Sequence, residues 1–129
     1  MTDRWLVVSL VAFGGLVNVL SGAAWAQGYP SKPVRVVVAS SAGSNPDTVG
    51  RVVASGLAQA FGQQVIVDDR AGAGGNIGAE LAARAPADGY TLFLAHTNHS
   101  INATLYRKLS YDIINDFSPV TMLALSPFV

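Results

Sequence analysis

Three short stretches of this chain consist mostly of small and polar residues, the types that let a ligand approach the main chain closely. They lie at residues 40–45, 70–76 and 96–100, and each follows an apolar segment. Two of them lead into expected helices, whose first N–H groups are free and whose dipole favours anions. Tight turns alone would explain one such stretch. Three that converge predict a cradle of main-chain amides for a small anion, most simply a carboxylate.

Two charged residues accompany these stretches. Asp47 falls in the first turn of an expected helix, where it either complements the helix dipole or accepts a hydrogen bond from a ligand hydroxyl or amine. The sequence leaves both roles open. Arg70 follows Asp68 and Asp69 directly. An ion pair with one of these carboxylates is therefore favoured over a contact with a bound anion.

The two histidines raise metal and catalytic hypotheses. His96 and His99 have no third ligand at a suitable spacing and the chain has no cysteine, so no metal site is expected. Serines stand in the first stretch, yet no G-x-S-x-G nucleophile motif is present. No catalytic residue is therefore expected, although a fragment of an exported α/β enzyme stays open as an alternative.

The glycine run at residues 72–78 is similar to a dinucleotide-binding fingerprint, because it lies between an expected strand and an expected helix. Its spacing is G-x-G-x-x-x-G rather than G-x-G-x-x-G. The acidic residue expected after the next strand is also missing, since that strand ends in Leu94, Ala95 and His96. A nucleotide-binding fold is therefore a second alternative, and no cofactor is expected.

Composition narrows the classes of protein further. The chain has 129 residues, 50% of them hydrophobic and 12% charged, with 8 basic residues against 8 acidic ones. A nucleic-acid partner is not expected, because binding by phosphate neutralisation needs a basic excess. The absence of cysteine excludes a disulfide scaffold.

The first residues have the pattern of an export signal. An apolar run covers residues 5–20, and Ala24-Trp25-Ala26 fits the small-x-small rule for cleavage before Gln27. A membrane anchor is the alternative, but the apolar run is short for a spanning helix. We expect residues 1–26 to be a cleaved signal peptide, with the mature protein in the periplasm.

The elements that must position the three stretches alternate between strand and helix. Strands are expected at residues 34–39, 65–67, 90–95 and 120–125. Helices are expected from Asn45 and Asn76, each acting as an N-cap, and a short one at 101–106. Apolar residues at helical spacing are expected to face the sheet, namely Val49, Val52, Val53, Leu57 and Ala60 in the first helix and Ile77, Leu81 and Ala85 in the second. The order predicts an open, mainly parallel α/β sheet with flanking helices.

Several segments closely resemble one family. They are YPSKPVR at 29–35, RAGAGGNIGAE at 70–80, ADGYTL at 87–92, INATLY at 101–106, and residues 111–112 and 116–120. These segments are similar to those of the Bug family, the extracytoplasmic solute receptors of tripartite tricarboxylate transporters. The resemblance implies a periplasmic binding protein with two α/β lobes (type II-like) that closes on a carboxylate-bearing solute and presents it to a membrane permease.

The resemblance also implies which residues bind the solute. Carried over by position, the ligand-binding residues are Ser41, Ala42, Gly43, Ser44 and Asp47 in the first loop, Gly74, Gly75 and Asn76 in the second, and Thr97 in the third. The family's chains are much longer, so residues 27–129 are expected to form a truncated, incomplete first lobe. We expect this chain to bind its solute weakly or not at all.

Overall fold

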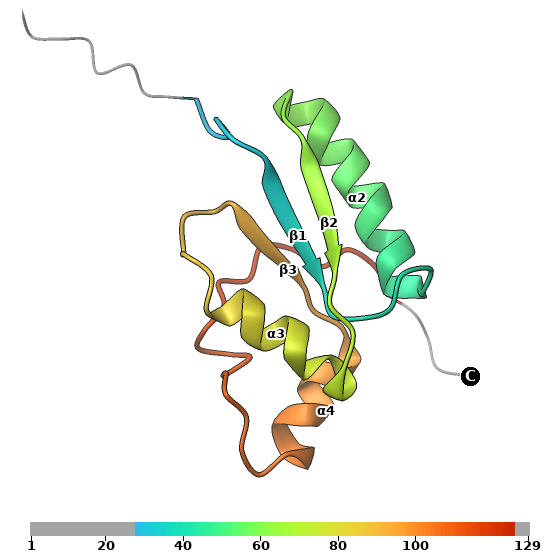
Figure 1. The fold of residues 1–129 in the computed structure, drawn as a ribbon, viewed down its shortest axis with the longest axis vertical. Coiled ribbons are helices and arrows are strands. Elements are labelled where there is room, and N and C mark those ends of the chain that lie inside the picture. The colour runs from blue at the N-terminus through green and yellow to red at the C-terminus, as the bar shows by residue number, and fades with distance from the viewer. Residues whose placement is uncertain (1–27, 126–129) are drawn as a thin grey trace, which may run out of the picture.

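The computed structural model describes residues 28–125, and the expected signal peptide at residues 1–26 lies outside them. Seven elements follow one another, and Figure 1 labels all but the 3-10 turn η1. They are β1 (Val34–Val38), α2 (Asn45–Phe61), β2 (Val65–Asp69), η1 (Ala73–Gly75), α3 (Asn76–Ala83), β3 (Thr91–Leu94) and α4 (Thr97–Leu105). None of the described helices combines the length and apolar character needed to cross a membrane.

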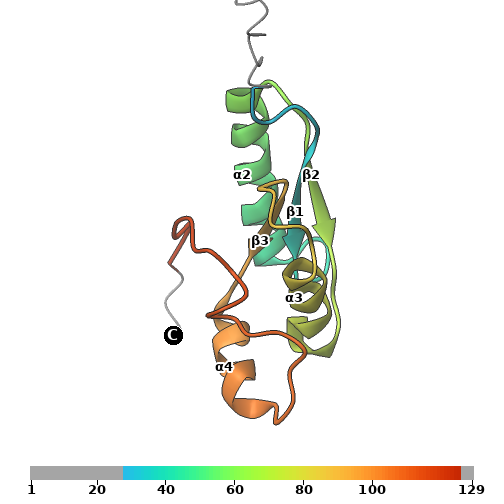
Figure 2. The same cartoon turned by 90° about the vertical axis from the view of Figure 1, so that its left-hand side faces the viewer.

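The three strands form one parallel sheet in the order β2-β1-β3, which confirms the expected open parallel α/β architecture. In register, Val36 of β1 stands beside Val67 of β2 and Leu92 of β3. The chain crosses from β1 to one side of the sheet and then passes back to the other. Helices α2 and α3 consequently lie on opposite faces, as Figure 2 shows.

The face of the sheet under α2 holds the main apolar cluster. Val36, Val38 and Leu94 are buried there, with Val49 of α2 packed against them. Gly50 brings α2 close to the strands, because a Cβ at this position would lie 3.0 Å from Val38 Cγ2. A close helix–sheet contact therefore depends on a residue without a side chain.

The ends of the helices lie near the expected residues, with one-residue corrections. Ser44, not Asn45, is the N-cap of α2, and Gly62 ends this helix in a left-handed conformation. Asn76 is the first residue of α3, and Gly75 occupies its N-cap position. The helix expected at 101–106 begins earlier, at Thr97, because the polar residues after β3 form its first turn.

Other sequence predictions were wrong. Val52, Ala60 and Ile77 are exposed, since the buried residues of the two helices are instead Asp47, Gly50 and Ala54 in α2 and Gly78 and Ala79 in α3. No strand forms at residues 120–125, whose side chains are exposed. A strand needs the hydrogen bonds of a neighbouring strand, and in the described part of the chain β3 is paired only with β1.

Aromatic rings close the amino-terminal edge of the sheet. The rings of Tyr29 and Tyr90 have their centroids 5.1 Å apart, and the Tyr29 hydroxyl donates a hydrogen bond to the carbonyl of Gly89 (2.6 Å). Lys32 pairs with Asp88 at 3.1 Å. The polar and charged side chains at this edge therefore have partners within the chain.

Candidate functional site

The segments that follow the carboxyl ends of the three strands come together around Gly75. A Cβ on Gly75 would lie 3.2 Å from the carbonyl oxygen of Ala39, just after β1, and 3.0 Å from Nε2 of His99 in α4. The loops that leave the three strands are therefore neighbours. The chain leaves the central strand β1 toward β2 and returns to β3 on the other side, which makes this edge a topological switch point. Open α/β sheets bind ligands at such points.

The first loop, residues 40–44, is held by its own side chains. Residues 41–44 form a turn in which the Ser44 amide donates to the Ser41 carbonyl (3.2 Å), with Gly43 at φ +80°. The hydroxyl groups of Ser40 and Ser44 are 2.8 Å apart, and the Gly43 amide donates to an Asp47 carboxylate oxygen at 2.7 Å. The loop and the first turn of α2 therefore form one hydrogen-bonded unit.

Asp47 is buried, with 2% of its surface exposed, and uses both carboxylate oxygens within the chain. One accepts the bond from Gly43 and the other lies 2.7 Å from Nε of Arg51, which also pairs with Asp69 at 2.9 Å. The Gly43 amide and Arg51 hold the pKa of Asp47 below its usual value. Burial, and then the charge of Asp47, raise the pKa of Asp69.

The second loop turns through four successive residues with positive φ. The φ angles are +127° at Gly72, +49° at Ala73, +66° at Gly74 and +94° at Gly75. The Gly75 amide donates to the Gly72 carbonyl at 2.9 Å. We call residues 72–75 the glycine turn. Successive main-chain N–H groups in a turn can form the kind of concavity that binds anions.

Side chains from far along the chain hold the glycine turn. Asn102 Nδ2 donates to the Gly74 carbonyl (2.9 Å) and to Asn76 Oδ1 (2.8 Å), and the Tyr111 hydroxyl also donates to Asn76 Oδ1 (2.8 Å). Asn102 and Tyr111 are buried. No role was predicted for them from the sequence, although both lie in segments that resemble the family, at residues 101–106 and 111–112.

The third loop is the first turn of α4. His96 occupies its N-cap position, and Nδ1 of His99 lies within hydrogen-bond distance of both the amide (3.1 Å) and the carbonyl (3.0 Å) of His96. The ring of His99 packs edge-on against Phe93, with centroids 5.0 Å apart. Burial lowers the pKa of His99. The serine hydroxyls of the first loop bond to each other, and within residues 28–125 neither histidine bonds to a serine.

The nine residues expected to bind a ligand lie on these three loops in different environments. Ser41, Ala42, Gly43, Gly74 and Thr97 are exposed, Ser44 and Asn76 are half-buried, and Asp47 and Gly75 are buried. The amides of Ser41, Ala42, Ala73 and Gly74 make no hydrogen bond to another described residue. The amides of Thr97 and Asn98, the first two of α4, make no hydrogen bond to another described residue, whereas that of His99 donates to the His96 carbonyl (3.0 Å).

Arg70 pairs with a neighbouring carboxylate, as the sequence analysis favoured. Its Nε lies 2.8 Å from Asp68 Oδ1, and Arg35 holds the other oxygen of the same carboxylate. Burial opposes ionisation of Asp68, but the two guanidinium groups outweigh it and lower the pKa of Asp68. Among residues 28–125, no group of three or more acidic or histidine side chains could hold a metal ion.

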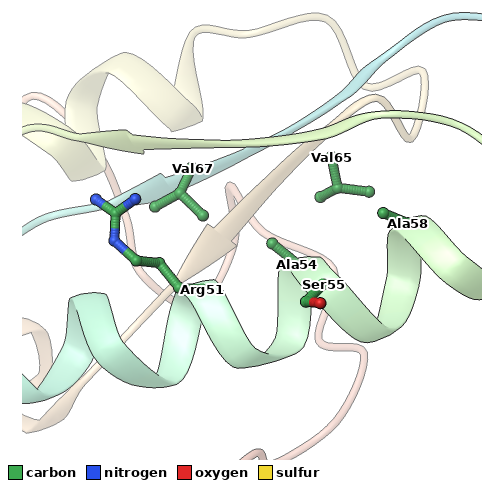
Figure 3. A pocket seen from close by; sticks show the side chains of 6 residues that line it. All are labelled: Arg51, Ala54, Ser55, Ala58, Val65 and Val67. Atoms are coloured by element: carbon green, nitrogen blue, oxygen red, sulfur yellow. The ribbon is translucent and has the colours of Figure 1, made fainter.

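A groove of about 310 Å³ lies away from this edge, between α2 and β2. Figure 3 shows small side chains along it and Arg51 at one end, reaching from α2 toward β2. Its other lining residues are Ala54, Ser55, Ala58, Val65 and Val67. The guanidinium is already paired with Asp47 and Asp69, so the groove offers no free polar group comparable with the loop amides.

A parallel sheet with amide-lined loops at its switch point defines an α/β protein of the ligand-binding type. The chain belongs to the family described as tripartite tricarboxylate transporter family receptor (TctC), whose profile matches residues 49–129. It is 41% identical over 128 residues to a UPF0065 protein of Agrobacterium vitis, covering 98% of this chain and 36% of that protein. The chain thus spans about a third of the length of this relative.

Two solved structures are also similar. The periplasmic binding protein BugD is 38% identical with a TM-score of 0.68, over 70% of this chain and 30% of that one. MatC from Rhodopseudomonas palustris with bound malate is 36% identical with a TM-score of 0.70, over 74% of this chain and 33% of that one. Both comparisons confirm the Bug-type resemblance and the fold.

Proposed function

We propose that this chain forms part of an extracytoplasmic solute receptor, which binds a small carboxylate-bearing metabolite for a tripartite tricarboxylate transporter. The observation that carries the proposal is the set of unpaired main-chain amides on neighbouring loops at the switch point. Family membership supports the receptor class, and the malate bound to MatC supports a dicarboxylate as the ligand. The role is binding without catalysis.

In this proposal the nine site residues share two tasks. Four exposed residues, Ser41, Ala42, Gly74 and Thr97, present main-chain N–H groups to a carboxylate directly or through water. The others, Gly43, Ser44, Asp47, Gly75 and Asn76, keep the loops in shape through the hydrogen bonds described above or through close packing. The Asp47 carboxylate therefore contributes by orienting the first loop, and Arg51 offsets its negative charge.

The proposal extends to location and partners. Residues 1–26 direct export and are removed, residues 27–129 belong to the first lobe, and the protein works in the periplasm with the membrane permease of its transporter. Likeness to a periplasmic binding protein supports this location. Because the loops lie open on one side, we expect a dissociation constant for malate on the order of 1 mM, weaker than an enclosing cleft gives.

Nuclear magnetic resonance tests the proposal on the ¹⁵N-labelled chain, because shifts report weak binding residue by residue. Addition of malate is expected to shift the amide signals of Ser41, Ala42, Gly74 and Thr97 in a saturable way. The uncharged diamide of malate is the ligand control and is expected to shift none of them. Equal shifts from both compounds, or malate shifts confined to the groove between α2 and β2, would refute the proposal.

One substitution tests the main-chain contact itself. Ala42 is the second residue of the turn at residues 41–44, a position that accepts proline. Ala42→Pro removes only the N–H group from the first loop, and we expect malate binding to weaken about tenfold, as loss of a charge-assisted hydrogen bond does. Ala42→Gly keeps the N–H group and is the matched control, with binding retained.

A further inference from the structure

Helix α4 buries two polar side chains and exposes its large apolar ones. Its two buried side chains are His99 and Asn102, which are 1% and 5% exposed, whereas Ile101 is 54% and Leu105 69% exposed. A helix held by apolar packing has the opposite arrangement. The buried face of α4 must therefore be selected for the hydrogen bonds and contacts that it makes.

All of these contacts converge on the glycine turn and the residue after it. Asn102 donates to the Gly74 carbonyl and to Asn76. Nε2 of His99 lies so close to Gly75 that a Cβ there would be 3.0 Å from it. Tyr111, a buried residue six positions beyond the end of α4, donates its hydroxyl to the same Asn76 oxygen. Asn102 and Tyr111 thus hold the turn and the residue after it by hydrogen bonds, and His99 packs against Gly75.

The glycine turn needs such support to keep one conformation. Glycine populates many φ and ψ values almost equally, and Ala73, at φ +49°, is held in a region that residues with a side chain seldom adopt. Within the turn itself, the Gly75 amide bond to Gly72 is one of few constraints. Without outside contacts the amides of Ala73 and Gly74 would point in many directions.

We infer that His99, Asn102 and Tyr111 are positioning residues, which fix the glycine turn so that the amides of Ala73 and Gly74 stay directed at the ligand. They act through the turn without touching the ligand. The inference rests on the proposed function for the identity of that ligand, a carboxylate, but the ordering of the turn can be measured without it. Helix α4 is then part of the binding site although only its first turn reaches the ligand.

The test compares two tyrosine substitutions in the ¹⁵N-labelled chain. Tyr111→Phe removes the hydroxyl that bonds to Asn76 and keeps the ring beside Phe117. Tyr29→Phe is the matched control, because it removes a hydroxyl that bonds to the Gly89 carbonyl at the opposite edge of the sheet. Hydrogen exchange of the Gly75 amide, which donates to the Gly72 carbonyl, is the first readout and is measured without ligand. Malate affinity is the second readout.

We expect Tyr111→Phe to speed exchange at Gly75 about tenfold and to weaken malate binding by a similar factor, as loss of one hydrogen bond does. Tyr29→Phe is expected to leave both values unchanged, even where it lowers global stability equally. Equal exchange at the turn in the two variants would overturn the inference. Asn102→Asp, which replaces a donor by an acceptor facing the Gly74 carbonyl, is the second variant and is expected to have the larger effect.

The two readouts separate this inference from the proposed function. If malate fails to shift the wild-type amides, the proposed binding of malate by this chain is wrong, and the exchange rates alone decide whether the three residues hold the turn. If malate binds and neither variant changes exchange at Gly75, the proposed function stands and the positioning role is wrong.

Discussion

The first loop and the glycine turn leave neighbouring strands at the same edge, yet they are held in different ways. The first loop closes on itself and on the next turn of α2, through contacts no more than four residues apart, such as Gly43 to Asp47. Asn76, directly after the glycine turn, is held by Asn102 and Tyr111, which are 26 and 35 positions away. Both loops consist of small residues, but local contacts hold the first loop and tertiary contacts hold the glycine turn.

The largest expected effect comes from the close contact that α3, the helix after the glycine turn, makes with the residues after β1 and β2. A Cβ at Gly78 of α3 would lie 2.8 Å from Ala39 Cβ, 2.9 Å from Ala39 Cα and 3.0 Å from the Arg70 carbonyl oxygen, so main chain must move. We expect Gly78→Ala to lower the free energy of unfolding by about 2 kcal/mol, because overpacking outweighs the gain in helix propensity. Urea denaturation measures this change.

Gly56→Ala provides the matched control in α2. No atom lies within 4 Å of a Cβ at Gly56, so only helix propensity acts and stability should rise by roughly 0.5 kcal/mol. If both substitutions stabilise the protein, α3 is not seated on the end of β1 as tightly as the structure has it.

Asp47→Asn tests whether the first loop is independent of the second. The amide side chain keeps an acceptor for Gly43 but places a donor or an uncharged oxygen beside Arg51. We expect exchange at the Gly43 amide to become about tenfold faster, with the Gly75 amide unaffected, because the two loops share no direct partner. Hydrogen exchange by nuclear magnetic resonance reports both amides in one experiment.

Asp116→Asn is the control for this change. Asp116 accepts a bond from the Asp112 amide at 2.7 Å in an exposed turn, so its substitution repeats the chemistry away from the first loop. Equal acceleration at Gly43 and Gly75 in Asp47→Asn would show that the two loops open together, and the distinction between them would be lost.

The difference between local and tertiary contacts also explains which features the sequence could predict. The three parallel strands follow from short apolar runs, which are β-branched in β1 and β2, and the start of α2 follows from a polar residue, a proline and an acid in succession. The N-cap is Ser44, one residue before the expected position, because several adjacent residues here are of types that can cap a helix. Such signals depend on neighbours in the chain, which a sequence displays directly.

The remainder depends on contacts that no local pattern records. Asn102 and Tyr111 became parts of the site because the fold brings them to Asn76. The segment at residues 120–125 has strand-like composition and no strand beside it, so its residues remain unpaired. Ile77 has helical spacing with Leu81, yet α3 turns a different face to the sheet, because Gly78 packs closely against Ala39.

A change of pH should distinguish the two loops without any substitution. Burial lowers the pKa of His99 from 6.5, so the unfolded chain binds a proton more readily and the contribution of His99 is lost as the pH falls below about 6.5. The pKa of Asp47 is lowered from 3.8, so its contribution is complete above that value and is lost only in more acidic solution.

Between pH 7.5 and 5.5 the protection of the Gly75 amide should therefore fall while that of Gly43 stays constant. Exchange rates divided by the intrinsic rate at each pH give these protection factors. In His99→Gln, which cannot gain a proton, the difference between the two pH values should disappear. A parallel loss at Gly43 would mean that the whole domain, not the glycine turn, responds to pH.

The smallest expected effect concerns the cap of the first loop. Ser44 Oγ accepts from the Asp47 amide at 3.5 Å, which is long for a hydrogen bond, and its shorter contact is with the Ser40 hydroxyl at 2.8 Å. We expect Ser44→Ala to cost about 0.5 kcal/mol in urea denaturation, the lower limit for loss of a helix cap. Ser55→Ala, at an exposed position of the same helix, controls for the change in helix propensity. A cost above that of Gly78→Ala would reverse the comparison, because the local contacts would then stabilise the site more than the tertiary ones.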